Sequence, residues 1–229
     1  MSAKLPDNVS FETAAPLACA GVTIYKGILQ SGCKSGEWLG IVGSGGGLGH
    51  LGVQFAKALG IKVAGIDARD SALEMTRSYG ADVTVDAREG DDAAAKAVLD
   101  ATPGGEGCKS TLVVSDAKGA AALACRITRM HGTVVQIAQP DEVVIPFAQL
   151  VFRDVRVKGS LVANPEEAAR MLEDVAKYGV TVTTHPVKGL DRVPELVELA
   201  HSGKLRGKGI VVIDQAQIDE QNKQGIKMV

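Results

Sequence analysis

The sequence predicts an α/β domain built on a doubly wound parallel sheet. Short apolar runs rich in β-branched residues alternate with longer alanine-rich stretches whose apolar positions recur at helical spacing. This alternation is typical of strand–helix–strand units in a parallel sheet. The strand runs are almost continuously apolar, as expected where helices cover both faces of a sheet.

The predicted strands leave room for a helix between most neighbours. They cover residues 39–42, 62–66, 83–85, 111–114, 133–137, 155–158 and 210–213, and small residues follow most of these runs. The predicted helices cover residues 48–59, 71–79, 91–101, 119–130, 165–178 and 193–201. We expect each crossover between parallel strands to be right-handed, as almost all are.

The two ends of the chain depart from this pattern. Residues 1–36 form a predicted lead-in segment whose residues 11–29 are helix-like, followed by a Ser-Gly stop signal. Residues 37–214 are expected to hold the sheet domain. Residues 215–229 are polar and lack aromatic side chains, which predicts a loose C-terminal tail.

Composition and charge exclude several kinds of partner. The chain has 25 Lys and Arg against 27 Asp and Glu, so a net charge of -2 offers no attraction to nucleic acid or anionic membranes. No apolar run approaches the roughly 18 residues of a membrane span, and the first residues do not resemble a signal peptide. The four cysteines are scattered, without a Cys-x-x-Cys pair. We therefore expect a cytoplasmic protein with reduced, mostly buried thiols and a small-molecule substrate.

A glycine-rich loop, VGSGGGLG, joins the first predicted strand to the first predicted helix. Glycines let the backbone approach a pyrophosphate closely, and the amides at a helix N-terminus attract its negative charge. The predicted phosphate-binding positions are Gly43, Gly46, Gly47 and Gly49. Gly52 falls inside the helix and is predicted to permit close packing on the sheet. The loop thus indicates a Rossmann-type dinucleotide-binding fold, and a tight turn without a ligand is the alternative.

Asp67 ends the second predicted strand, 20 residues after Gly47. A carboxylate there accepts hydrogen bonds from both hydroxyls of an adenosine ribose and repels a phosphate on that ribose. The sequence therefore favours NAD over NADP. Arg69 is the opposing feature, because its guanidinium can receive such a phosphate. A solvated strand-end carboxylate is the alternative interpretation of Asp67.

Several long stretches resemble the medium-chain zinc-dependent alcohol dehydrogenases, especially the fungal enzymes. The resemblance covers about residues 5–213 and is carried by LPDNVSFETAAPLACAGVTIYKGI, VGSGGGLGHLGVQFAKALG, GTVVQIAQP, VKGSLVANPEEAARML and HSGKLRGKGIVVI. The cofactor positions that it implies are Leu48 over the pyrophosphate loop, Ser115 near the adenosine, and Ile137, Ser160 and Val162 beside the nicotinamide. Lys208 stands where the family has an arginine that contacts the pyrophosphate, and a lysine keeps the charge without the two-pronged fork. Ala72 replaces a lysine of the family.

The family places a catalytic domain ahead of the part that this sequence resembles, and we expect the chain to lack it. Cys19 alone matches a catalytic zinc ligand of the family. A catalytic zinc needs about three protein ligands, so we expect no bound zinc. The alternative role of Cys19, beside a packed helix residue, is that of a nucleophilic free thiol.

No motif identifies a residue that could act as proton donor in place of the catalytic zinc. The candidates are Cys19, Tyr25, His50 and Asp116. Of the histidines, only His50 lies next to the predicted cofactor loop, and an inert side chain at a helix start is the alternative.

Three functions are compatible with this sequence. The first is a truncated, zinc-independent oxidoreductase that transfers hydride between NAD(H) and a small alcohol, carbonyl or enone substrate. The second is a non-redox enzyme, such as an isomerase, cyclase, dehydratase or lyase, that reuses the vacated cleft. The third is an NAD-binding module without catalysis. The intact fingerprint favours the first.

The resemblance also implies an assembly, because relatives join subunits through the sheet edge near VVIPFAQLVFRDVRVKGSLV. Val155 and Val157 alternate there with Arg156 and Lys158. An exposed edge strand of this kind pairs readily with a symmetric copy of itself. We therefore expect a homodimer.

Overall fold

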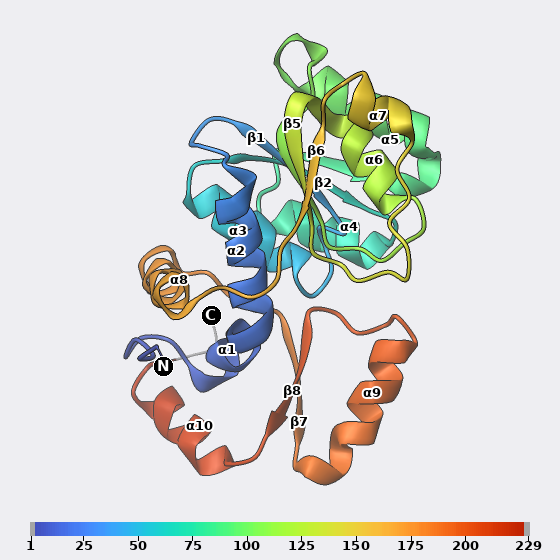
Figure 1. Cartoon of the computed structure of the whole chain (residues 1–229). Helices are drawn as coiled ribbons and strands as arrows, with labels where there is room; N and C mark the ends of the chain where they lie inside the picture. The colour runs from blue at the N-terminus through green and yellow to red at the C-terminus, as the bar shows by residue number, and fades with distance from the viewer. Residues whose placement is uncertain (1–2, 227–229) are drawn as a thin grey trace. The chain divides into compact units, whose positions relative to one another are not determined.

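The computed structural model describes residues 3–226, which fall into two compact units. One unit is the continuous stretch Thr23–Val162, and the other combines the chain up to Val22 with the chain from Ala163 onward. This division differs from the predicted domain of residues 37–214, because the sheet unit begins earlier and ends earlier. Figure 1 shows the elements of both units.

Within the described residues, the unit Thr23–Val162 is built on a six-stranded parallel sheet with the order β3-β2-β1-β4-β5-β6. The strands are β1 Trp38–Val42, β2 Lys62–Asp67, β3 Val83–Asp86, β4 Cys108–Val113, β5 Thr128–Gln136 and β6 Arg156–Gly159. The order progresses outward from β1 in both directions, which confirms the doubly wound Rossmann-type fold. Between β1 and β4 the connections leave in opposite directions, and this reversal opens a crevice at the carboxyl ends of the strands.

Helices cover both faces of this sheet (Figure 1). They are α2 Val22–Ser31, α3 Gly49–Ala58, α4 Asp70–Ser78, α5 Asp91–Ala101, α6 Ala120–Ile127 and the short α7 Phe147–Val151, with 3-10 turns η2 Ala87–Glu89 and η3 Pro103–Gly105. On the face of α2 and α3, Gly52 lies against Ile24 and Ile41, as predicted for close packing. On the other face, α5 and α6 bury Val98 and Leu123 in one apolar core with the strands.

The junction of α6 and β5 differs from the prediction of a helix over residues 119–130. The helix ends at Ile127, and β5 begins at Thr128, five residues before the predicted strand. The Thr128 hydroxyl donates to the Ala124 carbonyl at 2.7 Å, while Thr128 itself pairs with Cys108 of β4. Apolar Ile127 and Met130 continue the helical spacing, so the sequence pattern did not reveal this boundary.

The other unit contains, within the described residues, a separate two-stranded parallel sheet of β7 Thr184–Lys188 and β8 Lys208–Val212. The predicted strand over residues 210–213 thus belongs to this sheet and not to the main one. The 3-10 turn η4 Leu190–Arg192 and helix α9 Val193–His201 connect its strands. We did not predict β7, because Pro186 interrupts it and Val187 is its one buried side chain.

The remaining helices of this unit are α1 Phe11–Pro16, the π-helical turn η1 Leu17–Gly21, α8 Pro165–Tyr178 and α10 Gln215–Lys223. Together with α2, the first two form the helical lead-in that the sequence predicts. The predicted loose tail is wrong over α10, because Asp214 caps that helix and the Gln221 side chain accepts a hydrogen bond from the Phe11 amide at 2.9 Å. No helix within residues 3–226 combines the length and apolar character needed to cross a membrane.

Candidate functional site

A cavity of about 530 Å³ lies at the carboxyl ends of β1, β2 and β4. Its lining includes Gly43, Gly46, Asp67, Arg69, Ser115 and Asp116. The cavity coincides with the point where the strand order reverses, which is where doubly wound sheets bind ligands. Its volume falls within the range of small-molecule sites, roughly 300–1,000 Å³.

The glycine loop between β1 and α3 has a backbone conformation that requires glycine at some of its positions. Gly43 has a φ of 93°, which L residues rarely adopt, and its amide donates to the Ile66 carbonyl at 2.8 Å. A Cβ atom on Gly49 would lie 2.1 Å from the Gly43 carbonyl oxygen. The loop therefore folds back on itself immediately before the helix.

This fold leaves two main-chain amides without an acceptor just before α3, within the described residues. The Gly46 amide donates to Gly43, and the His50 amide donates to Gly46, each at 3.1 Å. Among residues 3–226, the amides of Gly47 and Leu48 have no acceptor within hydrogen-bonding distance, and no side chain caps α3. Two unpaired donors at a helix N-terminus favour an anion such as a pyrophosphate.

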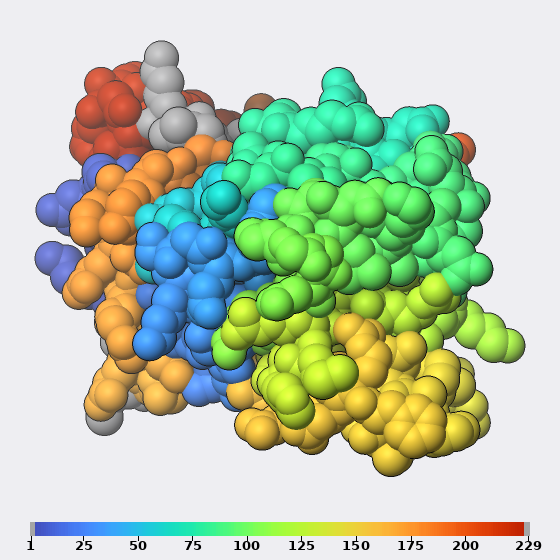
Figure 2. All heavy atoms as spheres, turned by 90° about the horizontal axis from the view of Figure 1, so that it is seen from above, coloured from blue at the N-terminus to red at the C-terminus, as the bar shows by residue number. Residues whose placement is uncertain are grey.

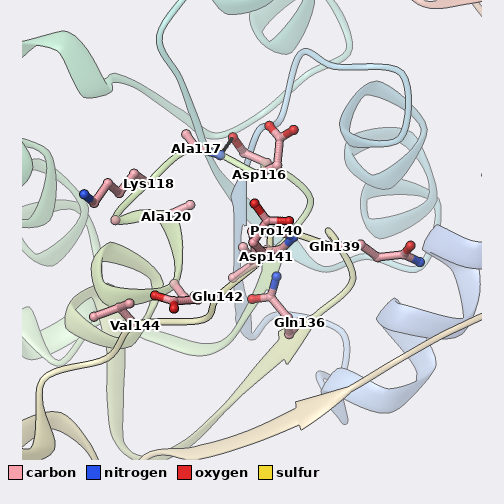
Figure 3. Close-up of a pocket in the computed structure, with 14 residues that line it drawn as sticks. Asp116, Ala117, Lys118, Ala120, Gln136, Gln139, Pro140, Asp141, Glu142 and Val144 are labelled. Carbon is pink, nitrogen blue, oxygen red and sulfur yellow. Dashed lines mark hydrogen bonds between the residues drawn. The ribbon is translucent and has the colours of Figure 1, made fainter.

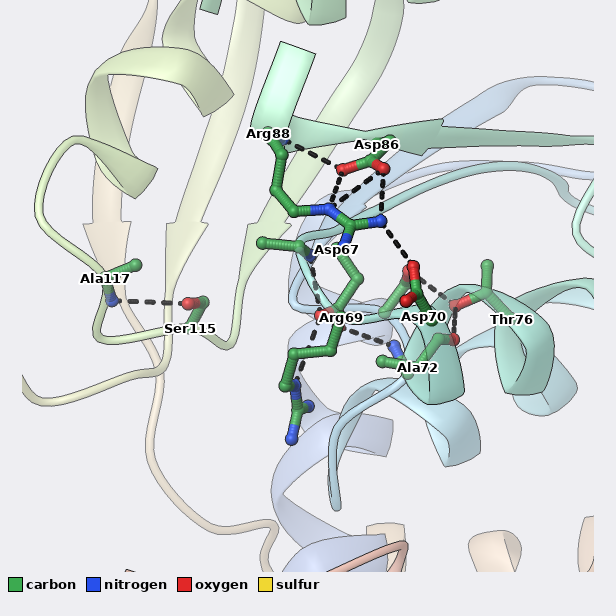
Figure 4. A network of polar contacts seen from close by, with 12 residues as sticks. Asp67, Arg69, Asp70, Ala72, Thr76, Asp86, Arg88, Ser115 and Ala117 are labelled. Carbon is green, nitrogen blue, oxygen red and sulfur yellow. Dashed lines mark hydrogen bonds and ion pairs between the residues drawn. The ribbon is translucent and has the colours of Figure 1, made fainter. Parts of the chain in front are cut away.

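Asp67 joins the end of β2 to this loop (Figure 4). One of its carboxylate oxygens accepts a hydrogen bond from the Gly45 amide at 3.1 Å, and the other accepts one from the Ala68 amide at 2.8 Å. The Nε of Arg69 lies 3.5 Å from the second oxygen. Because the Asp67 side chain is only 7% exposed, it is not the solvated strand-end carboxylate considered above.

A hydrogen bond between two buried hydroxyls connects the glycine loop to α4. Thr76 of α4 donates to the Ala72 carbonyl at 2.9 Å, so its oxygen accepts from the Ser44 hydroxyl at 2.8 Å. Both hydroxyl side chains are inaccessible to solvent. Helix α4 therefore fixes the position of the glycine loop, a role that the sequence pattern did not indicate.

Comparison with known proteins now gives the family. The sequence profile described as zinc-binding dehydrogenase matches residues 47–177. The chain belongs to this family. An alcohol dehydrogenase of Geobacillus stearothermophilus is 35% identical over 212 residues, which make up 92% of this chain and 61% of that protein. Alcohol dehydrogenase 1 of Emericella nidulans is 33% identical over 212 residues, or 92% of this chain and 60% of that protein.

A solved structure leads to the same family. The alcohol dehydrogenase of the archaeon Aeropyrum pernix matches with a TM-score of 0.81 and 27% identity, over 92% of this chain and 61% of that one. The predicted resemblance to zinc-type alcohol dehydrogenases is confirmed. The chain spans about 60% of the length of the curated relatives named above.

The residues that the dehydrogenase resemblance assigns to the coenzyme lie mostly at the carboxyl edge of the sheet. Ser115 follows β4 and accepts a hydrogen bond from the Ala117 amide at 3.2 Å. Ile137 and Ser160 follow the neighbouring strands β5 and β6, and the Ser160 amide donates to the Gln136 carbonyl at 2.9 Å. Val162, two residues on, is 52% exposed. Their roles toward a coenzyme remain predictions.

A second cavity, of about 570 Å³, lies beside the loop that follows β4 (Figure 3). It shares Ser115 and Asp116 with the first cavity, so this loop lies between the two. Its other wall is the segment after β5, which contributes Asp141 and Glu142. Sequence reasoning assigned no function to this segment.

Lys208 and Cys19 belong to the other unit, where they line a cavity of about 290 Å³. Lys208 begins β8, and burial lowers the pKa of its ammonium group. Cys19 is exposed within the turn η1, whereas Cys108 and Cys125 are buried. No three His, Cys, Asp or Glu side chains within residues 3–226 gather into a group that could hold a metal ion. These residues therefore do not fit the zinc of the family.

Two of the four catalytic candidates are core side chains. Tyr25 is 3% exposed and packs edge to face on Phe55, with ring centroids 5.3 Å apart. His50 is fully buried, and its Nδ1 donates to the Gly46 carbonyl at 2.9 Å, so it supports the loop. Asp116 is exposed and is the one candidate that lines the 530 Å³ cavity.

Proposed function

We propose that the chain binds NAD(H) and forms the coenzyme-binding part of an alcohol-dehydrogenase-like oxidoreductase. The observation that carries this proposal is the cavity that Gly43 and Gly46 of the glycine loop line together with the buried Asp67. The same loop continues into Gly47 and Leu48, whose amides have no acceptor among residues 3–226. Membership of the dehydrogenase family supports it. A bound nicotinamide coenzyme exchanges hydride with the substrate, here a small alcohol, carbonyl or enone.

In this proposal the protein holds the coenzyme at several points. The amides of Gly47 and Leu48, together with the N-terminus of α3, receive the pyrophosphate. The carboxylate of Asp67 is oriented by two main-chain amides, and each oxygen keeps a further lone pair for a ribose hydroxyl. Leu48, Ser115, Ile137, Ser160 and Val162 take the contacts that the family resemblance implies.

We further propose that residues 3–226 carry no zinc. Cys19 is the single residue that matches a ligand of the family, and these residues contain no group suited to a metal. Hydride transfer to a carbonyl builds negative charge on oxygen, so a hydrogen-bond donor must take the place of the metal. Elemental analysis of the purified protein should give far less than one zinc per chain, and stoichiometric zinc would contradict this proposal.

Coenzyme binding is tested by calorimetry and thermal denaturation with and without NAD. NAD at 100 times its Kd should stabilise the fold by about 2.7 kcal/mol. A spectrophotometric screen of alcohols and aldehydes for NADH formation or consumption then tests the redox step. A protein whose melting temperature does not respond to saturating NAD, and which releases no heat on titration, would refute the binding proposal.

A coenzyme-binding module without catalysis is the second candidate. The observation that favours it is the burial of Tyr25 and His50, two of the four candidate acids and bases, neither of which lines the 530 Å³ cavity. Tight NAD binding without turnover of any substrate would support this candidate over the oxidoreductase.

We also propose a homodimer that forms through β6. This strand lies at the end of the sheet order, and all four of its residues are exposed. The adjoining segment exposes Phe147, Val151 and Phe152 by 67–70%, and Figure 2 shows the region around residue 150 on the surface, in yellow. Apolar groups at this exposure favour burial against a second copy. Light scattering at micromolar concentration should give the mass of a dimer, and a monomer mass would refute the assembly.

A cytoplasmic location completes the proposal. Cys33 and Cys108 are free thiols within the described chain, which suits a reducing compartment. Cell fractionation tests this location directly, and recovery of the protein outside the cytoplasm would contradict it.

A further inference from the structure

We propose that Cys19 and Lys208 form an acylation site, in which the exposed thiol accepts a short acyl group from a thioester and transfers it to the lysine amine. Both residues belong to the unit that combines the chain up to Val22 with the chain from Ala163 onward. The site goes beyond the proposed function, because the coenzyme cavity belongs to the other unit.

The two side chains line one cavity, of about 290 Å³, although they are far apart in the sequence. Cys19 comes from the turn η1, whereas Lys208 is the first residue of β8. Helix α1, which leads into η1, packs on β8 and so brings these two parts of the chain together (Figure 1). The Lys208 amide donates to the Thr183 carbonyl at 2.8 Å, which holds the backbone from which the amine extends.

The Lys208 side chain extends away from α9. A Cβ atom on Gly209 would lie 3.1 Å from Leu196 of α9, so position 209 faces that helix. Successive side chains of a strand point to opposite faces of its sheet, so Lys208 points to the other face. Burial lowers the pKa of its ammonium group, and Cys19 is the one ionisable neighbour within residues 3–226 that opposes this shift. The amine and the thiol therefore lie within electrostatic reach of one another.

The two groups differ in their access to solvent. Cys19 is exposed, whereas Lys208 is partly buried, and none of the described residues that line the cavity is acidic. Burial without a counter-ion disfavours the ammonium form, and the neutral amine is the nucleophilic form. A bulky acyl carrier in solution therefore meets the thiol before the amine.

The size of the cavity limits what it can hold. Its volume of about 290 Å³ lies at the lower end of small-molecule sites, which span roughly 300–1,000 Å³. Apart from Cys19 and Lys208, its lining consists of Ala, Pro, Gly, Ile and Val residues. Such a cavity suits a short aliphatic acyl group and leaves the carrier of that group outside.

The transfer takes two steps, neither of which needs an oxidant or a reductant. In the first, the Cys19 thiolate attacks the carbonyl carbon of the thioester, and the carrier leaves as a thiol that takes up the proton released by Cys19. In the second, the neutral Lys208 amine attacks the same carbon, the bond from that carbon to the Cys19 sulfur breaks, and a proton of the amine passes to the sulfur. The products are an amide on Lys208, which has lost its positive charge, and a free Cys19 thiol.

Acetyl coenzyme A is the probe, and peptide mass spectrometry on the full chain follows the acetylation of each lysine over time. Lys208 should be acetylated at least about tenfold faster than exposed Lys204, because the acyl group reaches it within the molecule. An acetyl N-hydroxysuccinimide ester reacts with accessible amines directly. This second reagent should therefore label Lys204 before Lys208.

Three variants follow the path of the acyl group. Cys19→Ser should slow the acetylation of Lys208 by about tenfold or more and leave that of Lys204 unchanged. Cys33→Ser is the matched control, because it removes a partly buried thiol from the other unit and should change neither rate. Lys208→Arg should leave the acetyl group on Cys19, from which hydroxylamine releases it. Thermal denaturation of each variant checks that the fold is retained.

Three results would overturn the acylation site. Equal acetylation of Lys208 in wild-type protein and in Cys19→Ser would show that the amine reacts with the thioester directly. Acetylation of Cys19 without modification of Lys208 would exclude the second step, and the absence of acetyl groups from both residues would exclude the first. None of these measurements involves NAD, so the proposed function is tested separately.

Discussion

Replacing Gly49 by alanine tests the geometry of the phosphate loop. Gly49 is the first residue of α3, where alanine is favoured over glycine by up to about 1 kcal/mol. The structure predicts instead that alanine at this position destabilises the protein. The new Cβ would lie 2.1 Å from the Gly43 carbonyl oxygen and 2.6 Å from two backbone atoms of Ser44, whereas ordinary contact begins at 3.4 Å. These are backbone atoms, which cannot move away by rotating a side chain, so the whole loop must shift by about 1 Å. Overpacking of this kind lowers the free energy of unfolding by about 1–3 kcal/mol.

Allowing for the gain in helix propensity, we expect Gly49→Ala to lower the free energy of unfolding by about 1–2 kcal/mol. In a chain of this size that corresponds to a fall in melting temperature of about 2–8 °C. Displacing the amides of Gly47 and Leu48 should also weaken NAD binding by at least about tenfold. Thermal denaturation and calorimetry measure the two effects separately.

Gly46→Ala provides the matched comparison within the same loop. A Cβ there would stand 3.3 Å from the Gly43 carbonyl oxygen, with no other backbone atom among its near neighbours, and Gly46 lines the cavity. This variant should fold with a stability within about 1 kcal/mol of wild type and still bind the coenzyme less tightly. Wild-type melting and wild-type NAD affinity in Gly49→Ala would refute this account of the loop.

Three further changes test other parts of the structure. Thr76→Val removes the hydroxyl that accepts from buried Ser44, so the free energy of unfolding should fall by about 1–3 kcal/mol, and recovery with Thr76→Ser separates the hydrogen bond from packing. Burial raises the pKa of Cys108 to about 12, so at about pH 8 it stays a neutral thiol, and mass spectrometry after iodoacetamide treatment should find exposed Cys19 labelled first. Rapid labelling of native Cys108 would contradict that burial. The pKa of Asp82 is lowered, because hydrogen bonds from a lysine ammonium and a main-chain amide outweigh its partial burial. The ionised Asp82 carboxylate contributes to the free energy of unfolding above its ordinary pKa of 3.8, and this contribution is lost as the pH falls through the lower pKa of the folded state. Asp82→Asn should therefore destabilise the protein at neutral pH and much less in acid. Equal destabilisation at both pH values would refute the electrostatic origin.

The parts of the site that the sequence predicts are those encoded by neighbouring residues. The glycine loop could be recognised because its residues are contiguous and stand between a strand pattern and a helix pattern. Asp67 could be recognised because it ends the next strand at a characteristic distance along the chain. The alternation of strands and helices was likewise sufficient to predict the doubly wound sheet.

The parts that escaped prediction depend on contacts between distant residues. The Ser44–Thr76 hydrogen bond joins residues 32 positions apart, and no local pattern marks Thr76 as a support for the loop. His50 looked like a candidate acid from its place in the sequence, yet the fold buries it completely. Strand β7 was missed because Pro186 opposes the local propensity and pairing with β8 overrides it.

The hydrogen bond from the Gly45 amide to Asp67 has a practical consequence for redesign. The same carboxylate that would select the coenzyme also anchors the turn on which its diphosphate would rest. Exchanging this acid to alter cofactor preference would therefore loosen the turn, and the two effects would be confounded in any affinity measurement. Substitutions at the neighbouring arginine alter the charge of the pocket while leaving that anchor in place, which makes position 69 the cleaner starting point for protein engineering.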